Sequence, residues 1–175
     1  SAASDVYKRQ DPILFSQSMD VRYHLHGFEA IAKRLASHTQ TCVISFVDLY
    51  QKTRRNLRAT TVREPSADEI TRLAAGLASI ASSYGIRIQS CAERIDLEPM
   101  GIRHGRCIDR MLIEELQGAR LNVARDRNQR PECGCVQSVD IGVYDTCSHG
   151  CLYCYANTDT KTVCRNRGLH DLSSP

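Results

Sequence analysis

The chain has 175 residues, of which 42% are hydrophobic, so it is long enough to bury one core and fits a single domain. Its formal net charge of +3 at pH 7 is too small to indicate a nucleic-acid-binding protein on its own. No apolar run approaches the ~20 residues that a membrane-spanning helix needs, and no signal peptide is recognisable. We therefore expect a soluble, cytoplasmic protein with no membrane partner.

The first ten residues look foreign to the rest of the chain. The chain does not begin with Met, and Asp5-Val-Tyr-Lys-Arg-Gln10 is what the end of a common sequencing-transposon adapter encodes. We therefore interpret residues 1–10 as translated adapter and leave them out of the predicted fold. Native codons for these residues upstream of Asp11 in the genome would contradict this interpretation. Because the far end stops at Pro175 without a predicted cap, we expect the chain to be a fragment of a longer protein.

Helices alternate with short apolar strands along the chain. Ser18 and Asp20 are N-cap residue types, and they precede a helix that is predicted to run to about Ser37. The apolar face of this helix consists of Leu25, Phe28, Ile31, Ala32 and Leu35. The nearly continuous apolar run Cys42–Val47 predicts a strand covered on both faces, and the basic residues after it predict a loop.

The alternation continues to the C-terminal part of the chain. Ser66–Glu69 has the spacing of a capping box, and the helix that it begins is predicted to end before Gly85. The apolar face of that helix consists of Ile70, Leu73, Leu77, Ile80 and Ala81. Strands are predicted over Ile86–Cys91 and Val136–Tyr144, with a helix over Ile108–Leu116 between them. This order predicts an α/β fold with βαβ units and a mainly parallel sheet.

Polar and reactive side chains follow the predicted strands. In parallel α/β sheets, the working groups lie at the carboxyl ends of the strands. Asp48 follows the first predicted strand, Cys91 and Glu93 follow the second, and Cys147 follows the third. If the strands are neighbours, we expect these groups to meet at one edge. Structural roles stay open: Asp48 as a cap or ion-pair partner, Cys91 as a small buried side chain, and Glu93 as an ion-pair partner.

Nine cysteines are a high number for a chain in a reducing compartment, where clustered thiols are typical of metal or redox sites rather than of disulfides. Three of them, which we call the array cysteines, have the spacing C-x3-C-x2-C: Cys147, Cys151 and Cys154. This spacing lets one loop wrap three thiolates around an iron–sulfur cube while one iron lacks a protein ligand. Gly150 removes a side chain beside Cys151, so the loop can turn closely around a cluster.

Spacing alone leaves three interpretations of the cysteines open, because soft sulfur ligands suit both iron–sulfur clusters and zinc. The first is a [4Fe–4S] cluster on the array cysteines. The second is a structural zinc ion held by Cys133, Cys135, Cys151 and Cys154, which would leave Cys147 unused. The third is that the cysteines hold no metal.

Two further patterns carry weaker signals. His104 and Cys107 have a spacing compatible with a metal site, but a lone His–Cys pair predicts little. Six arginines would contact phosphates in a nucleic-acid-binding protein: Arg54, Arg55, Arg58, Arg125, Arg127 and Arg130. Little aromatic sequence lies beside them for base stacking, so we expect solvated loop charges and no nucleic-acid partner.

The array and the chain as a whole resemble known families. Cys147-x3-Cys151-x-Tyr153-Cys154 resembles the cluster motif of radical S-adenosylmethionine (radical-SAM) enzymes, and Cys154-Tyr-Ala156 is similar to the spore photoproduct lyase branch. A longer similarity, over residues 11–175, is to the bacterial family catalogued as domain of unknown function 1848. Its landmarks are Asp11–Leu14, Val43–Asp48, Cys91–Glu93, His104-Gly105, Cys107–Asp109, Asn128–Arg130, Cys133–Val136, Asp140–Gly142 and Cys147–Asn157.

The resemblance implies a cofactor and a reaction type. Cys147, Cys151 and Cys154 would hold a [4Fe–4S] cluster, S-adenosylmethionine would bind its open iron, and Tyr153 would lie near the adenine. Reduction by an electron donor would cleave the sulfonium and release an adenosyl radical, which would act on an unknown small-molecule or macromolecular substrate. The alternative is a non-catalytic domain that holds structural zinc or an electron-transfer cluster at the same cysteines.

The resemblance also implies a domain organisation. Members of the family are longer, which implies that this chain lacks the first strands of a barrel-like (β/α) fold. We therefore expect residues 11–132 to form a truncated barrel. Residues 133–175 are expected to add the last strand and the cysteine-rich cluster loop to the same domain.

Overall fold

A computed structural model of the protein describes residues 7–139 and 141–169, with side chains from residue 12 onward. The chain divides into two units, the first of residues 1–47 and 62–138, and the second of residues 48–61 and 139–175. The predicted division at residue 133 stays a prediction. None of the helices in the described part of the chain combines the length and the apolar composition that a membrane crossing requires.

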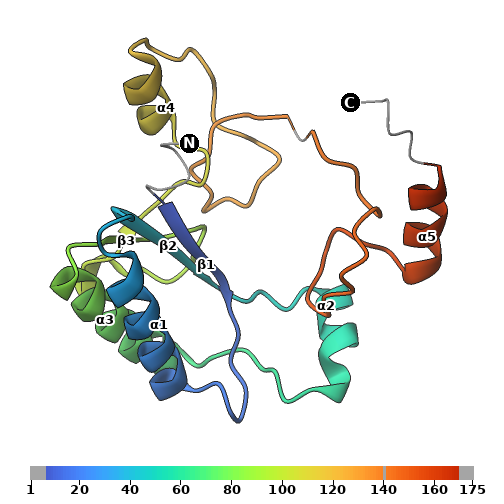
Figure 1. Cartoon of the computed structure of the whole chain (residues 1–175), viewed down its shortest axis with the longest axis horizontal. Coiled ribbons are helices and arrows are strands. Elements are labelled where there is room, and N and C mark those ends of the chain that lie inside the picture. The colour runs from blue at the N-terminus through green and yellow to red at the C-terminus, as the bar shows by residue number, and fades with distance from the viewer. Residues whose placement is uncertain (1–6, 140, 170–175) are drawn as a thin grey trace. The chain divides into compact units, whose positions relative to one another are not determined.

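The first unit is built on a four-stranded parallel sheet (Figure 1). In spatial order the strands are β1 (Tyr7–Ile13), β2 (Thr41–Phe46), β3 (Arg87–Ser90) and β4 (Arg103–His104). Thr41 of β2 pairs with Tyr7 of β1 on one side and with Arg87 of β3 on the other. The parallel sheet with alternating helices confirms the predicted α/β class, and these four described strands do not close into a barrel.

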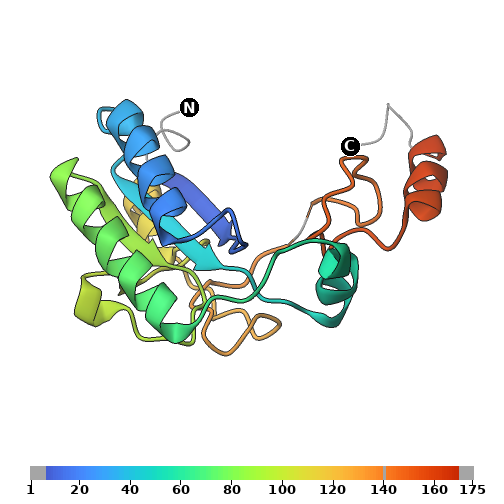
Figure 2. The same cartoon turned by 90° about the horizontal axis from the view of Figure 1, so that it is seen from below.

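Two amphipathic helices, α1 (Val21–Leu35) and α3 (Ala67–Ser83), lie side by side on one face of the sheet (Figures 1 and 2). Asp20 caps α1 by accepting a hydrogen bond from the Tyr23 amide at 2.9 Å. The predicted capping box of α3 is present, since the Glu69 amide donates to Ser66 Oγ and the Ser66 amide donates back to the Glu69 carboxylate. Gly85, with φ +67°, follows the end of α3 as predicted.

The main core lies between these helices and the sheet. Cys42, Ile44 and Phe46, at alternate positions of β2, belong to this core together with residues of both helices. The helical members include Phe28, Ala32, Ile70, Leu73, Leu77 and Ala81. Every residue of β2 is buried, which confirms the prediction that the apolar run Cys42–Val47 is covered on both faces.

One position on α1 departs from the predicted apolar face. Ile31 is 39% exposed, whereas His24 is buried on the same helix. The ring of His24 packs 5.1 Å from the ring of Phe15, and its Nε2 donates to the Leu14 carbonyl oxygen at 2.8 Å. Burial of this ring lowers the pKa of His24 from its usual value. An imidazole can thus occupy a core position when its polar edge has a backbone partner.

The predicted strand over Val136–Tyr144 is wrong for the residues that the structure describes. Val136 makes only an isolated antiparallel bridge with Arg125. Val139, Ile141 and Val143 are 87%, 101% and 74% exposed, so the alternating pattern does not bury one face. A sequence that alternates apolar and polar residues forms a strand only where a neighbouring strand can pair with it. The landmark residue Asp140 lies outside the described residues.

Several described elements were not among those predicted. Tyr7–Gln10 of β1 fall within the segment that we interpret as adapter-encoded, and that interpretation stays a prediction. The predicted basic loop after β2 is instead partly helical, since α2 spans Gln51–Asn56 and a 3-10 turn, η1, spans Leu57–Ala59. The polar sequence of α2 and η1 has no helical apolar period from which to predict them.

The remaining elements are η2 (Glu98–Met100), α4 (Arg110–Gln117) and α5 (Thr160–Gly168). Of these, α4 confirms the predicted helix before Gly118.

The ion pair at the start of α3 predicts how stability depends on pH. Arg63 donates to both carboxylate oxygens of Glu69, at 2.7 and 2.6 Å, and this bond together with the Ser66 amide lowers the pKa of Glu69 from 4.5 to about 2. Because the pKa is lower in the folded chain than in the unfolded chain, the stabilisation is fully present above about pH 4.5 and is lost as the pH falls towards 2.

We therefore expect Glu69→Gln to flatten the fall in the free energy of unfolding between about pH 4.5 and about pH 2. Urea unfolding at several pH values checks this. Glu29→Gln, at an exposed position of α1, is the matched control and should keep the parent pH profile. An unchanged slope in the Glu69 variant would show that the pair does not stabilise the fold.

Candidate functional site

The array cysteines lie on a loop of the second unit whose two ends are hydrogen-bonded together (Figure 1). The Asp145 amide donates to the Ala156 carbonyl oxygen at 3.0 Å. The Asp145 carboxylate accepts from the Thr158 amide and, at 3.0 Å, from the Thr158 hydroxyl. Asn166 of α5 donates to the Asp145 carbonyl oxygen at 3.2 Å. Asp145 therefore closes the loop of residues 146–157, which we call the cysteine loop.

Bonds within the cysteine loop position the three array cysteines. The Cys154 amide donates to the Cys151 carbonyl oxygen at 3.0 Å, and the Asn157 side chain donates to the Cys147 carbonyl oxygen at 2.6 Å. Gly150, just before Cys151, has φ +65°, a left-handed conformation that glycine adopts readily. Cys147 and Cys151 are exposed, Cys154 is half-buried, and none of the three forms a disulfide. Three thiols that solvent can reach thus lie on one closed loop.

Aromatic side chains beside the array are also accessible. Tyr153 is 42% exposed and Tyr155 is 76% exposed, so both rings can contact a flat ligand. The Asn56 side chain of α2 donates to the Leu152 carbonyl oxygen at 3.2 Å, so α2 contacts the cysteine loop directly. The predicted role of Tyr153 at a cofactor stays a prediction.

A pocket of about 520 Å³ lies in the same unit. It is lined by Gln51, Lys52, Arg55, Arg58, Tyr155 and Thr158. Its lining holds three cations and no carboxylate, and no ion pair to Lys52, Arg55 or Arg58 occurs among the residues described. The pocket therefore offers a positive surface that suits an anionic group. Tyr155, which lines the pocket, directly follows Cys154 in the sequence.

In the first unit, Cys91 and Glu93 lie at the carboxyl ends of the strands, as predicted. The Cys91 amide donates to the Ile44 carbonyl oxygen at 2.8 Å, and Glu93 accepts from the Phe46 amide, also at 2.8 Å. Glu93 thus bridges from the end of β3 to the end of β2. Asp48 and Cys147 belong to the second unit, so their place at the same edge stays a prediction.

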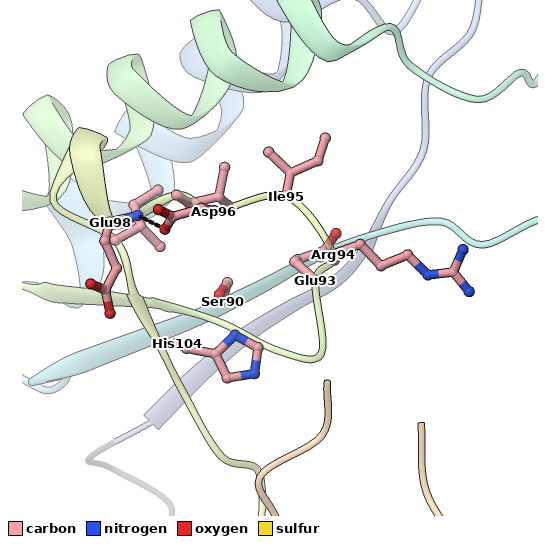
Figure 3. A pocket seen from close by; sticks show the side chains of 9 residues that line it. Ser90, Glu93, Arg94, Ile95, Asp96, Glu98 and His104 are labelled. Carbon is pink, nitrogen blue, oxygen red and sulfur yellow. Dashed lines mark hydrogen bonds between the residues drawn. The ribbon is translucent and has the colours of Figure 1, made fainter. Parts of the chain in front are cut away.

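Glu93 also lines a smaller pocket of about 230 Å³, which Figure 3 shows from close by. Ser90 and His104, paired on β3 and β4, form part of its wall, and Glu98 and Asp96 belong to a turn that closes another side. The Nε2 of His104 donates to the Glu132 carbonyl oxygen. The shared metal site that the spacing of His104 and Cys107 suggested stays a prediction, and Cys107 contacts a different group.

That group is Cys91, whose Sγ lies 2.8 Å from Cys107 Sγ. Cys135 Sγ accepts from the Cys107 amide at 3.2 Å and from the Ile108 amide at 3.3 Å. Burial raises the pKa of the Cys135 thiol, the Ile108 and Cys107 amides oppose that rise, and the neighbouring Cys133 adds to it. We call Cys91, Cys107, Cys133 and Cys135 the edge cysteines.

Neither set of cysteines is arranged as a finished metal site. Among the side chains that the structure describes, no three of His, Cys, Asp and Glu are grouped in positions that would hold an ion as they stand. The donor chemistry of the cysteine loop nevertheless fits a thiolate-bound group, because its three sulfurs are accessible and share one closed loop. The predicted ligand roles of Cys147, Cys151 and Cys154 stay predictions.

Sequence patterns did not reveal the parts that organise these sites. Asp145 lies two residues before Cys147 and matches no motif, and its partners Ala156, Thr158 and Asn166 become neighbours only through the fold. The place of Lys52 in the pocket was not predicted, because its segment was expected to be a loop. The signals for the edge cysteines were the place of Cys91 after a predicted strand, the His104–Cys107 spacing and the C-x-C spacing of Cys133 and Cys135.

The closure of the cysteine loop gives a testable expectation. Asp145→Ala removes both carboxylate bonds to Thr158 and places a side chain without polar groups at φ +58°. We expect any metal group on the array to be lost to a chelator about tenfold faster than from the parent. Asp145→Asn, which keeps an acceptor and tolerates this φ, should lie between the two. Equal loss rates in the Ala variant and the parent would show that the closure is irrelevant to metal retention.

The chain was compared with known proteins. The family model described as "Domain of unknown function (DUF1848)" matches residues 2–156, a range that includes both the edge cysteines and the array cysteines. No curated protein and no solved structure matched the chain. Since the family match covers most of the sequence, the chain belongs to the family of domain of unknown function DUF1848.

Proposed function

We propose that the protein binds a [4Fe–4S] cluster through Cys147, Cys151 and Cys154 and acts as an enzyme of the radical-SAM type. The observation that carries the proposal is the cysteine loop, in which three accessible thiols share one loop closed by Asp145. The substrate stays unknown, and the reaction would require an electron donor.

The number of sulfurs on the loop favours a cluster over zinc. Structural zinc sites are almost always closed by four protein ligands, and the cysteine loop carries three cysteines. A cubane accepts three thiolates and keeps one iron open for an exogenous ligand. The imidazole of His149, between Cys147 and Cys151, is the one other soft donor in the loop, so zinc on the array would need it or a more distant residue.

The surroundings of the array support ligand binding beside the cluster. When bound, a [4Fe–4S] cluster with an open iron supplies the one-electron chemistry, while the protein orients the reactants. Tyr153 would stack against the adenine, because its ring is exposed. Lys52, Arg55 and Arg58 would hold an anionic group in the pocket that Tyr155 borders, either the carboxylate of S-adenosylmethionine or a charged group of the substrate.

Anaerobic reconstitution of the full chain with iron and sulfide tests the proposal. We expect about four irons and four sulfides on the array. The reduced chain should give a cubane EPR signal, and addition of S-adenosylmethionine should change it. Cys164→Ser is the matched control, because Cys164 is exposed on α5 and lies outside the array. It should retain both the cluster and the response.

Two other results would separate the alternatives. A cubane EPR signal that does not change when S-adenosylmethionine is added would support an electron-transfer cluster and reject the radical-SAM assignment. Tightly bound zinc with no iron would reject the cluster itself. In that case His149→Ala would show whether the zinc is held within the loop, since it removes the fourth soft donor there.

A further inference from the structure

The edge cysteines come from three separate segments that the fold brings together in the first unit. Cys91 follows β3, Cys107 follows β4, and Cys133 with Cys135 lies on a later segment whose Val136 bridges to Arg125. Cys91, Cys133 and Cys135 pack in one small buried cluster with Val43 and Ala92. This cluster is distinct from the main core between the sheet and the helices.

Hydrogen bonds to backbone carbonyl oxygens hold the segments that carry these cysteines. The Gly105 amide donates to the Ser90 carbonyl oxygen at 2.7 Å, which ties the segment before Cys107 to the end of β3. The Val136 amide donates to the Ile108 carbonyl oxygen at 3.2 Å and ties the two later segments together. Arg125 Nε donates to the Cys133 carbonyl oxygen at 2.8 Å. The four cysteines are therefore held by the fold rather than by side-chain packing alone.

The backbone is unusual directly after Cys91. Ala92 has φ +51°, a conformation that side chains other than glycine rarely adopt. Such outliers persist where the surrounding structure imposes them, and they concentrate at functional sites. Here the turn at Ala92 ends β3 and leaves Cys91 within 2.8 Å of Cys107, sulfur to sulfur.

Hydrogen-bond donors lie around the sulfur of Cys135, one of the edge cysteines. Two amides donate to Cys135 Sγ, and sulfur is a weak acceptor unless it is charged. Arg106, next to Cys107, lies so close over Gly134 that a Cβ there would come within 3.1 Å of its side chain. Glycine between Cys133 and Cys135 thus leaves room for the Arg106 side chain. A cysteine that is only a small buried side chain does not need two such amide donors.

From these observations we propose that Cys91, Cys107, Cys133 and Cys135 form a four-thiolate site for a single soft metal ion, with Zn²⁺ as the first candidate. On binding, four Zn–S bonds form and the four thiols release their protons to solvent, with no change of oxidation state. The site is independent of the array cysteines and would be structural, joining the ends of β3 and β4 to the segment of Cys133 and Cys135.

Binding requires an adjustment of the described geometry, which can be stated for the pair Cys91 and Cys107. Two sulfurs on one tetrahedral zinc ion lie roughly 3.8 Å apart, given Zn–S bonds of about 2.3 Å. Cys91 Sγ and Cys107 Sγ would therefore separate by about 1 Å from their 2.8 Å contact. Exposed Cys107 can provide this by rotation of its side chain. A cubane spreads its ligand sulfurs more widely than one ion does, so the closeness of this pair favours a mononuclear site.

Cobalt binding to a chain without array cysteines tests the site separately from the proposed function. In the full chain carrying C147A, C151A and C154A, we expect about one tightly bound Co²⁺ with the visible and charge-transfer bands of tetrahedral thiolate coordination, displaced by Zn²⁺. Adding C133S and C135S should abolish these bands, whereas adding Cys164→Ser should leave them unchanged. Because the array is absent throughout, the result does not depend on whether the cysteine loop binds iron.

Variants at Cys107, which is exposed, distinguish the loss of a metal ligand from a general loss of folding. Cys107→Ser should keep the parent circular dichroism and weaken cobalt binding at least about tenfold. Cys107→His should restore tight binding with a spectrum changed by the nitrogen ligand. The proposal is overturned if the array-deficient chain binds no Co²⁺ or Zn²⁺, if binding survives C133S with C135S, or if mass spectrometry of the anaerobic chain finds Cys91 and Cys107 joined in a disulfide.

Discussion

Replacing Cys151 by Ala is expected to lower the iron content of the anaerobically reconstituted chain at least about tenfold. Cys151 is the middle member of the array, and its carbonyl oxygen accepts from the Cys154 amide. Without its thiolate, two loop sulfurs remain, and two thiolates do not hold a cubane that normally takes three or four. Because Cys151 is exposed, its loss should leave the fold intact.

The matched control for this experiment is Cys164→Ala, which removes another exposed thiol of the second unit outside the cysteine loop. It should bind as much iron as the parent. Iron and sulfide analysis after removal of loosely bound metal provides the measurement. If the Cys151 variant retained the parent iron content and its cubane absorption, the array would not be the cluster site.

The second large effect concerns stability. Leu77→Ala is expected to lower the free energy of unfolding by about 2–5 kcal/mol. Leu77 lies on α3 with none of its surface exposed, within the core that joins α1, α3 and the sheet. Truncation there removes buried apolar surface and leaves a cavity that a close-packed core closes only in part. For a domain with about 5–15 kcal/mol of total stability, this loss is large.

Urea unfolding followed by circular dichroism measures that loss. Leu116→Ala on α4 is the matched control, because the same side chain is 63% exposed there and its removal should change stability by less than about 0.5 kcal/mol. A Leu77 variant as stable as the Leu116 variant would mean that the described packing of α3 against the sheet is not the stabilising core.

Local signals in the sequence predicted α1, α3, β2 and β3 of the first unit. The capping box at Ser66 and Glu69, the mostly apolar run of β2 and the terminator Gly85 each act through neighbouring residues, so their patterns can be read from the chain itself. The parallel sheet was predicted from the alternation of helices and strands, which is a rule of fold architecture.

Long-range effects account for most of what the sequence did not predict. Val139, Ile141 and Val143 alternate like a strand, but no described strand pairs with them, and pairing is a property of the fold. The contact between Cys91 and Cys107 depends on the parallel pairing of β3 with β4, a strand of only two residues. The closure of the cysteine loop by Asp145 likewise joins residues eleven or more positions apart.

The two sets of cysteines lead to different expectations for metal binding. The array cysteines are accessible, share one loop and lie beside a positive pocket, which suits a cofactor that reacts with a bound ligand. The edge cysteines come from three segments, and three of the four are buried, which suits a closed structural ion. A chain that carries both would hold iron at the exposed loop and zinc at the edge of its sheet.

Mössbauer spectroscopy of the reconstituted full chain, recorded with and without S-adenosylmethionine, tests the central claim most directly. We predict the spectrum of a [4Fe–4S] cluster in which one iron becomes distinct when S-adenosylmethionine is added, because the three array cysteines leave that iron open. The spectrum of an isolated iron ion in tetrahedral thiolate coordination, unchanged by S-adenosylmethionine, would contradict the claim.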